Sequence, residues 1–287
     1  MKKRLALILA AAFMAASFTG CGKNSTGSES ETTTEVNVEA ETESTTLDPQ
    51  TQAKLDKLMQ PATVFPQLEG VKPGDTIATI HTNKGDIKVW FFPEYAPKAV
   101  ENFTTHVKDG YYDGLTFHRV IDGFMIQGGD PNGDGTGGES IWGEPFGVER
   151  SFELRHFRGA LCMAKGQAEE SIGSQFYIVQ NKGLTDEEKS QLEQIKASKD
   201  EVYYENDNTK LTVGESIWPE KVIDEYIANG GTPALDMQYT VFGQVFEGME
   251  VVDAIAAVEK TTGGDGAESK PVEDIIIESV ELGTYEG

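Results

Sequence analysis

A single stretch in the middle of the chain limits the possible folds more than any other part of the sequence. Residues 117–130 read FHRVIDGFMIQGGD, in which apolar residues run up to Asp122-Gly123 and resume after it. An Asp-Gly pair is typical of a tight turn between antiparallel strands, so the stretch predicts a β-hairpin. Arg119 and Gln127 are its polar exceptions and stand close to an aromatic and a thioether side chain. This combination predicts a shallow apolar pocket with a polar wall. The alternative is a buried hairpin whose two polar side chains only satisfy backbone groups.

The composition restricts the partners of the protein. The chain has 287 residues and a net charge of -24, which argues against nucleic acid or an anionic membrane surface as a direct partner. Its length allows one large domain or two small ones. The 4 histidines are scattered without ligand spacing, so we predict neither a metal site nor a cofactor.

The N-terminus predicts a processing signal. Residues 1–20 begin with a basic segment, continue with an apolar run at 5–16 that is too short for a transmembrane helix, and lead to Cys21. This arrangement resembles a bacterial lipoprotein signal, in which Cys21 carries the lipid and is the first residue of the mature chain. We therefore expect a lipid-anchored protein on the extracytoplasmic face of the cell membrane. The alternative is an ordinary secretory signal with an incidental cysteine.

The segment after the signal differs from the rest in composition. Residues 21–73 are rich in Ser, Thr and Glu, with hardly an apolar side chain before about residue 48. Because such a segment buries too little to offset its ordering entropy, we predict a disordered tether. Cys162 is the only other cysteine. With Cys21 acylated no intramolecular disulfide can form, and Cys162 is expected to be a small buried hydrophobe.

Residues 74–284 are expected to form the folded domain. Short apolar runs predict strands, Pro97 is suited to the first turn of a helix that Gly110 ends, and a second helix is expected at 249–258. Many short strands with two helices suggest a closed antiparallel barrel. The expected strands, besides the central hairpin, are 76–81, 86–92, 160–164, 175–180, 241–246 and 274–282.

The glycine-rich segment after the hairpin is similar to the start of a calcium loop. Residues 130–135 read DPNGDG, but the bidentate acid expected at the twelfth position is replaced by Ile141 and no helix pair flanks the segment. A phosphate loop is no better supported, because no helix follows Gly137-Gly138. We therefore predict neither metal nor phosphate binding here.

The run FHRVIDGFMIQGGD closely resembles the core motif of the cyclophilins, a family of peptidyl-prolyl cis-trans isomerases. The resemblance implies a mainly β fold, a closed eight-stranded antiparallel barrel capped by two helices. It implies that Arg119 donates a hydrogen bond to the prolyl nitrogen. It also implies that Phe124 and Met125 line the proline cup and that Gln127 anchors the substrate backbone. These four residues are the expected catalytic residues.

Later segments extend the resemblance. Residues 163–164 are similar to the family segment that contacts the residue before proline, and GSQFYI at 173–178 is similar to the next motif. The segments at 235–236 and 241–243 match the stretch that follows an insertion at 185–232. The substrate-binding residues that the resemblance implies are Ala164, Gln175, Tyr177, Leu235 and Tyr239.

Four positions depart from the family pattern. Tyr177 replaces a pocket phenylalanine, and Lys165 replaces an asparagine. Ala234 replaces a tryptophan or other aromatic residue, and Tyr239 replaces a histidine. The arginine half of the site is therefore intact, while its far wall is altered.

The insertion at 185–232 has helical patterns of its own. Thr185 and Glu188 have the spacing of a capping box and precede apolar residues on one face. A second helix is expected from Pro219 to the glycine pair at 230–231. The alternative to a functional role is an insertion that only packs on the barrel.

Two functions from different classes remain open. One is an isomerase, expected to be monomeric, that acts on X-Pro segments of exported proteins and assists their folding without a cofactor. The other is a proline-peptide binding module or chaperone-like scaffold with weak or no isomerase activity. Arg119 favours the enzyme and Ala234 favours the binding module. A solute-binding lipoprotein would share only the anchor, because the two-lobed α/β pattern of that class is absent from the sequence.

Overall fold

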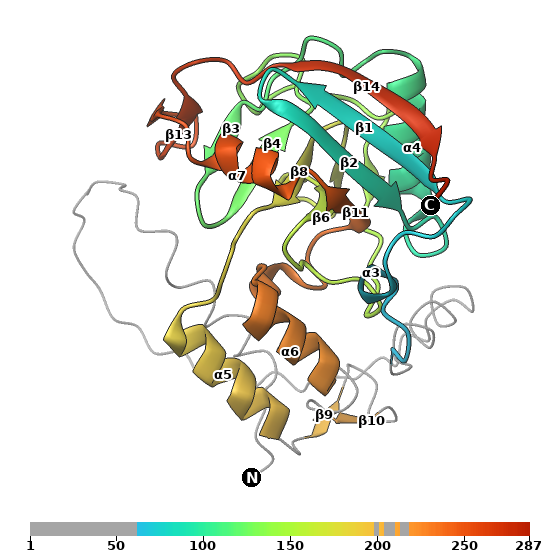
Figure 1. The fold of residues 1–287 in the computed structure, drawn as a ribbon, viewed down its shortest axis with the longest axis vertical. Coiled ribbons are helices and arrows are strands. Elements are labelled where there is room, and N and C mark those ends of the chain that lie inside the picture. Colours follow the sequence, from blue (N-terminus) through green and yellow to red (C-terminus); the bar gives the residue numbers. More distant parts are fainter. Residues whose placement is uncertain (1–61, 198–200, 204–209, 213–217) are drawn as a thin grey trace, which may run out of the picture.

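The computed structural model describes residues 62–197, 201–203, 210–212 and 218–287 (Figure 1). Its centre is an eight-stranded antiparallel sheet, in agreement with the mainly β expectation. In spatial order its strands are β14 (Ile277–Thr284), β1 (Thr76–Thr82), β2 (Gly85–Phe91), β11 (Val241–Glu247), β6 (Ala160–Met163), β8 (Phe176–Val179), β4 (Met125–Gly128) and β3 (Arg119–Ile121).

The sheet is open, so the expectation of a closed barrel is wrong. Its edge strands β14 and β3 form no ladder with each other. Irregular segments cross the gap instead: the N–H of Phe117 donates to the C=O of Ile275 (2.9 Å), and the N–H of Ile277 donates to the C=O of Leu115 (2.8 Å). These bonds flank a single isolated bridge between Thr116 and Ile276, which lie just outside the two edge strands. The sheet is therefore a half-barrel.

Side chains of the sheet alternate between two apolar clusters. Val120 and Ile126 belong to the cluster inside the half-barrel, whereas Met125, Cys162 and Tyr177 belong to a cluster on its outer face. This follows from the two-residue period of a strand. Cys162 is fully buried, as predicted, and burial raises the pKa of its thiol well above the usual value.

Two helices cover the inner cluster, as the sequence predicts. Helix α4 (Pro97–Lys108) packs against β14 and β11, and α7 (Met249–Ala256) packs against β2, β3 and β4. Proline suits the start of α4 because the first helical N–H has no partner within the helix. Phe103 of α4 and Ile255 of α7 are fully buried in the cluster.

The folded part begins before residue 74. Phe65 is buried, and a short helix, α3 (Pro66–Glu69), follows it. The side chain of Gln67 accepts a bond from the N–H of Arg155 (2.7 Å) and donates to its C=O (2.9 Å). The tether predicted over 21–73 is therefore wrong for residues 62–73. Residues 21–61 lie outside the described residues, as do the predicted signal at 1–20 and the anchor at Cys21.

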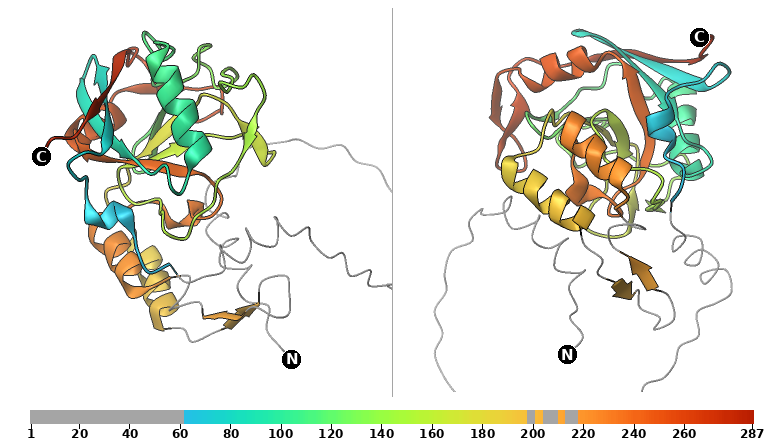
Figure 2. Two further views of the ribbon diagram at one scale, coloured as in Figure 1. Left: turned by 90° about the vertical axis from the view of Figure 1, so that its right-hand side faces the viewer. Right: turned by 60° about the horizontal axis from the view of Figure 1, so that its bottom comes forward.

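The insertion is helical, as predicted, and its helices α5 (Asp186–Ala197) and α6 (Glu220–Asn229) lie side by side (Figures 1 and 2). Thr185 and Glu188 form the expected capping box. The Thr185 hydroxyl accepts from the N–H of Glu188 (3.2 Å), and the Glu188 carboxylate accepts from the N–H of Thr185 (2.7 Å). Leu192 and Tyr226 are fully buried in a cluster that they share with Phe65. The insertion thus packs on the domain together with the N-terminal segment.

Three small two-stranded sheets were not predicted from the sequence. The pairs are β5 (Phe146–Gly147) with β7 (Glu170–Ile172), β9 (Glu201–Tyr203) with β10 (Lys210–Thr212), and β12 (Lys260–Thr262) with β13 (Glu268–Pro271). In the part of the chain that the structure describes, no helix has the length and apolar character needed to span a bilayer.

Candidate active site

The strand register places three predicted site residues in one row. Arg119 in β3 is paired with Gln127 in β4, and Gln127 is paired with Tyr177 in β8. Directly paired residues project to the same side of an antiparallel sheet. Tyr177 belongs to the outer-face cluster, so the guanidinium, the amide and the phenol lie next to one another on the outer face of the half-barrel.

Polar contacts continue along this row. Nη1 of Arg119 donates to Oε1 of Gln127 (3.4 Å), and Nε2 of Gln127 donates to Oε1 of Gln175 (2.9 Å). Nε2 of Gln175 donates in turn to the C=O of Gly137 (2.7 Å). Each amide therefore presents its oxygen to one neighbour and its nitrogen to the next. The structure brings Arg119, Gln127 and Gln175 together, as the sequence analysis expects.

Arg119 also forms an ion pair that the sequence analysis missed. Its Nε donates to Oδ2 of Asp265 at 2.7 Å, and the two side chains are 31% and 27% exposed. Asp265 lies in the turn between β12 and β13 and accepts a second bond from the hydroxyl of Ser269 (2.7 Å). Burial alone would raise the pKa of Asp265, but the bonds from Arg119 and Ser269 outweigh it and lower the pKa. The guanidinium is thus held from two sides, by Asp265 and by Gln127.

Apolar side chains beside the row form the cluster to which the resemblance assigns the proline cup. Met125 is buried, and its sulfur lies 3.8 Å from Nη1 of Arg119. Phe124, Ala164 and Leu235 are partly buried and pack against the same outer-face cluster as Met125. The predicted cup residues therefore lie next to the guanidinium.

Three of the four residues that depart from the family pattern contact one another. The rings of Tyr177 and Tyr239 meet edge to face with centroids 6.0 Å apart, and Nζ of Lys165 lies 5.2 Å from the centroid of Tyr239. The hydroxyl of Tyr177 lies 3.1 Å from Nε2 of His156. Ala234, the fourth departure, lies in the short 3-10 turn η2 (Pro233–Leu235). Lys165, Tyr177 and Tyr239 therefore form one connected group at the predicted far wall.

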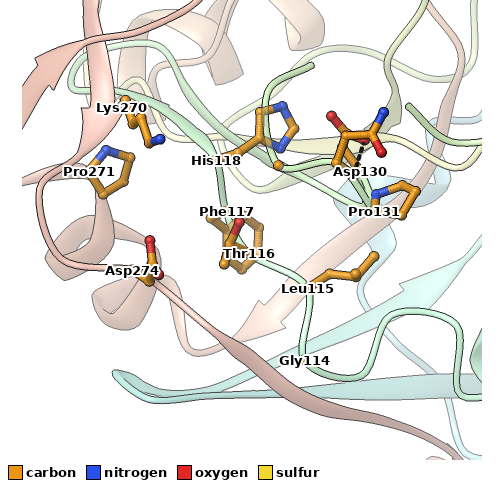
Figure 3. Close-up of a pocket in the computed structure, with 12 residues that line it drawn as sticks. Gly114, Leu115, Thr116, Phe117, His118, Asp130, Pro131, Lys270, Pro271 and Asp274 are labelled. Atoms are coloured by element: carbon orange, nitrogen blue, oxygen red, sulfur yellow. Dashed lines mark hydrogen bonds between the residues drawn. The ribbon is translucent and has the colours of Figure 1, made fainter. Parts of the chain in front are cut away.

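Figure 3 shows a hollow in the structure. Its volume is about 270 Å³, and none of the predicted site residues lines it. It is bordered by the segments at 114–118 and 130–133 and by Lys270, Pro271 and Asp274, close to the gap between the sheet edges. His118 is buried at this hollow, and burial lowers the pKa of its imidazole. The hollow and the cup are therefore separate features.

In the DPNGDG segment, the carboxylate of Asp130 accepts hydrogen bonds from backbone N–H groups of the same segment. Asp130 is 1% exposed, and its carboxylate accepts from the N–H groups of Asn132 (2.9 Å) and Gly135 (2.6 Å). This is the role of an Asp that closes a turn. Among the described residues, no group of three or more His, Cys, Asp or Glu side chains is placed to hold a metal ion.

Comparison with known proteins decides the family. Residues 77–282 match the family described as "Cyclophilin type peptidyl-prolyl cis-trans isomerase/CLD". The chain belongs to this family. The family resemblance carried by residues 117–130 is therefore confirmed, and so is the isomerase class that it implies.

Curated relatives of this cyclophilin are similar over nearly their whole length. A protein of Staphylococcus epidermidis is 42% identical over 221 residues, which are 77% of this chain and 98% of the relative. A protein of Staphylococcus haemolyticus is 43% identical over 221 residues with the same shares of 77% and 98%. A protein of Staphylococcus aureus is 42% identical over 219 residues, or 76% and 98% of the two chains. Each is named "Putative peptidyl-prolyl cis-trans isomerase".

Solved structures show the same fold. A cyclophilin type peptidyl-prolyl cis-trans isomerase of Cryptosporidium parvum is 28% identical, with a TM-score of 0.52 and coverage of 74% of this chain and 99% of that one. A second structure, also 28% identical with a TM-score of 0.52, was determined in the presence of the dipeptide Ala-Pro. The cyclophilin-like architecture of the chain is therefore confirmed.

Proposed function

We propose that this cyclophilin binds X-Pro segments of exported proteins in the cup beside Arg119 and accelerates rotation about the prolyl bond. The observation that carries the proposal is the position of Arg119. Its guanidinium is bonded to Asp265 and Gln127 and lies beside the sulfur of Met125, at the edge of the apolar outer-face cluster. The relative solved in the presence of Ala-Pro supports a proline-containing ligand.

The chemistry follows from the electronic structure of the amide. Resonance keeps the prolyl bond planar, with a rotation barrier of ~18–20 kcal/mol. Because a catalyst must bind the twisted amide better than either planar form, the site has to recognise what changes on twisting. Twisting localises the lone pair on the prolyl nitrogen. In the proposed complex Arg119 donates to that lone pair, while Phe124 and Met125 hold the ring and Gln127 binds the substrate backbone.

The test is isomerisation of an X-Pro peptide by the native chain and by Arg119→Ala and Arg119→Lys. A charge-assisted hydrogen bond is worth roughly 1.5–3 kcal/mol, and ~1.4 kcal/mol corresponds to tenfold in rate. We therefore expect Arg119→Ala to slow catalysis by roughly 10- to 100-fold. Arg119→Lys should also be impaired, because an ammonium does not reproduce the planar donor fork.

Circular dichroism of both variants checks that the fold is retained. An active native chain that is indifferent to both substitutions would show that Arg119 has another role. A native chain that binds the peptide but leaves the uncatalysed rate unchanged would favour the second candidate, a proline-peptide binding module. The observation that favours this candidate is the far wall, where Ala234 stands in place of the aromatic residue expected from the family pattern.

The location is part of the proposal. The basic and apolar segments of residues 1–20, followed by Cys21, support export and lipid attachment at the outer face of the cell membrane. The composition of the segment that follows Cys21 supports a flexible connection between the anchor and the domain. In this location the domain would meet exported chains while they are still unfolded.

A further inference from the structure

A buried polar network lies behind the far wall of the cup. Its centre is Asp236, whose side chain is 3% exposed and is paired with Arg155 (3.2 Å) and with Nδ1 of His156 (3.0 Å). The backbone N–H of His156 also donates to the Asp236 carboxylate (2.8 Å). A buried carboxylate is costly unless it is paired and hydrogen-bonded. The network therefore fixes the chain around residues 155–156 and 236 in one arrangement.

One end of the network belongs to the insertion. The hydroxyl of Tyr226, in α6, lies 2.8 and 2.9 Å from the two carboxylate oxygens of Asp236. Trp218, which precedes α6, lies with its ring centroid 5.2 Å from the guanidinium carbon of Arg155. Where the insertion returns to the sheet, the N–H of Thr232 donates to the C=O of His156 (2.8 Å). The insertion thus contacts the network through side chains and through its backbone.

The other end of the network reaches the cup. His156 has one ring nitrogen toward each side of the network: Nδ1 lies 3.0 Å from Asp236, and Nε2 faces the cup. The hydroxyl of Tyr177 lies 3.1 Å from Nε2, within hydrogen-bond distance. The Tyr177 ring in turn meets Tyr239, a second residue of the predicted substrate-binding set. A phenylalanine at position 177 would have the same ring but no bond to the network.

We propose that the insertion supports the far wall of the proline cup through the sequence of contacts Tyr226–Asp236–His156–Tyr177. In this arrangement Tyr226, Asp236 and His156 are positioning residues, and Tyr177 is the wall residue that they hold. Tyr177, which replaces the family's phenylalanine, then supplies the hydroxyl through which the helical insertion acts on the wall. The proposal rests on the proposed function for its kinetic readout.

The experiment compares the native chain with Tyr226→Phe, Tyr177→Phe and the double variant, using an X-Pro peptide. Each substitution removes one hydroxyl and keeps the ring. Loss of one typical hydrogen bond corresponds to about 2- to 10-fold in an equilibrium constant. We expect each single variant to raise KM and the peptide Kd by about that factor, with little change in kcat. We expect the double variant to match either single variant, because both changes release the same ring.

The matched control is Tyr285→Phe, since the Tyr285 ring packs against Phe246 near the C-terminus and belongs to neither the cup nor the network. It should leave KM and Kd unchanged. A Tyr226→Phe variant that lowers only the thermal midpoint, with native KM and Kd, would overturn the proposal. Effects of Tyr226→Phe and Tyr177→Phe that multiply in the double variant would also overturn it.

A second measurement separates this proposal from the proposed function. The side-chain ¹⁵N shifts of His156 report directly on its bonds to Asp236 and Tyr177 and need no catalysis. We expect Tyr226→Phe to move both shifts, even if the native chain proves to bind and turn over no X-Pro peptide, the outcome that would defeat the proposed function. Unchanged shifts in Tyr226→Phe would overturn the contact sequence itself.

Discussion

Arg119 shows how a single residue acquires its properties from its neighbours. Its place in β3 directs it to the outer face, and its pairing with Gln127 is a consequence of the hairpin register. Its ion pair with Asp265, by contrast, joins residues 146 positions apart. The pair is partly exposed, so its energetic value is smaller than that of a fully buried one. Its value to the enzyme lies in fixing the orientation of a long, flexible side chain.

This predicts that Asp265→Asn lowers kcat/KM on an X-Pro peptide by about 3- to 10-fold, because a partly screened ionic contact is worth about 1 kcal/mol. The measurement is steady-state isomerisation by the native and variant chains. Glu268→Gln is the matched control, since Glu268 is an exposed acid on the same hairpin and should leave kcat/KM unchanged. A faster Asp265→Asn enzyme would mean that the carboxylate competes with substrate for Arg119.

At the scale of secondary-structure elements, strand alternation and helix capping explain most of the local structure. The outer-face row arises because residues paired across β3, β4 and β8 project to one side. Helix α5 begins where Thr185 and Glu188 satisfy each other's backbone N–H groups. Both features follow from residues that are close in sequence or in register.

We expect Thr185→Ala to destabilise the insertion by about 1 kcal/mol, the usual cost of losing an N-cap side chain. Hydrogen exchange of the α5 amides, with thermal unfolding of the whole chain, measures the effect. The control Glu193→Ala changes an exposed position of the same helix and should stay within about 0.5 kcal/mol of the native chain. Equal protection of α5 in Thr185→Ala and in the native chain would show that the cap is energetically unimportant.

On the scale of the whole molecule, the N-terminal segment and the insertion form a second packed region next to the half-barrel. Phe65 and Tyr226 are buried in one cluster, and the α3 segment is joined to Arg155 through Gln67. The chain between the proposed anchor and the domain is therefore shorter than the composition suggests. This arrangement would hold the insertion and the start of the domain in a fixed relation to the cup.

The anchor prediction belongs to this scale. We expect Cys21→Ser to lose fatty-acid labelling and to leave the membrane fraction or be misprocessed, because the thiol is the proposed site of lipid attachment. Metabolic labelling and membrane fractionation measure both effects. Cys162→Ala, which changes the only other cysteine, should retain labelling. Native labelling and fractionation of Cys21→Ser would contradict the lipoprotein interpretation.

The sequence by itself determined the local features of the structure, which depend on residues close together in the chain, and it determined the family through one long motif. The central hairpin, the start of α4 at Pro97, the capping box and the burial of Cys162 are local consequences of residue type and period. The motif at 117–130 identified the family, and the register of the hairpin placed Arg119 beside Gln127.

Only the tertiary structure decided the contacts between distant segments. The edge strands β14 and β3 form no ladder with each other, and apolar runs in the sequence do not predict this because they indicate strands and not how a sheet closes. Asp265 reaches Arg119 from a separate hairpin, and Asp236 and His156 connect Tyr226 with Tyr177. The physical reason is that a buried or partly buried charge must be paired or hydrogen-bonded, and its partners are the groups that folding brings close to it. The spacing of residues along the sequence does not predict which groups these are.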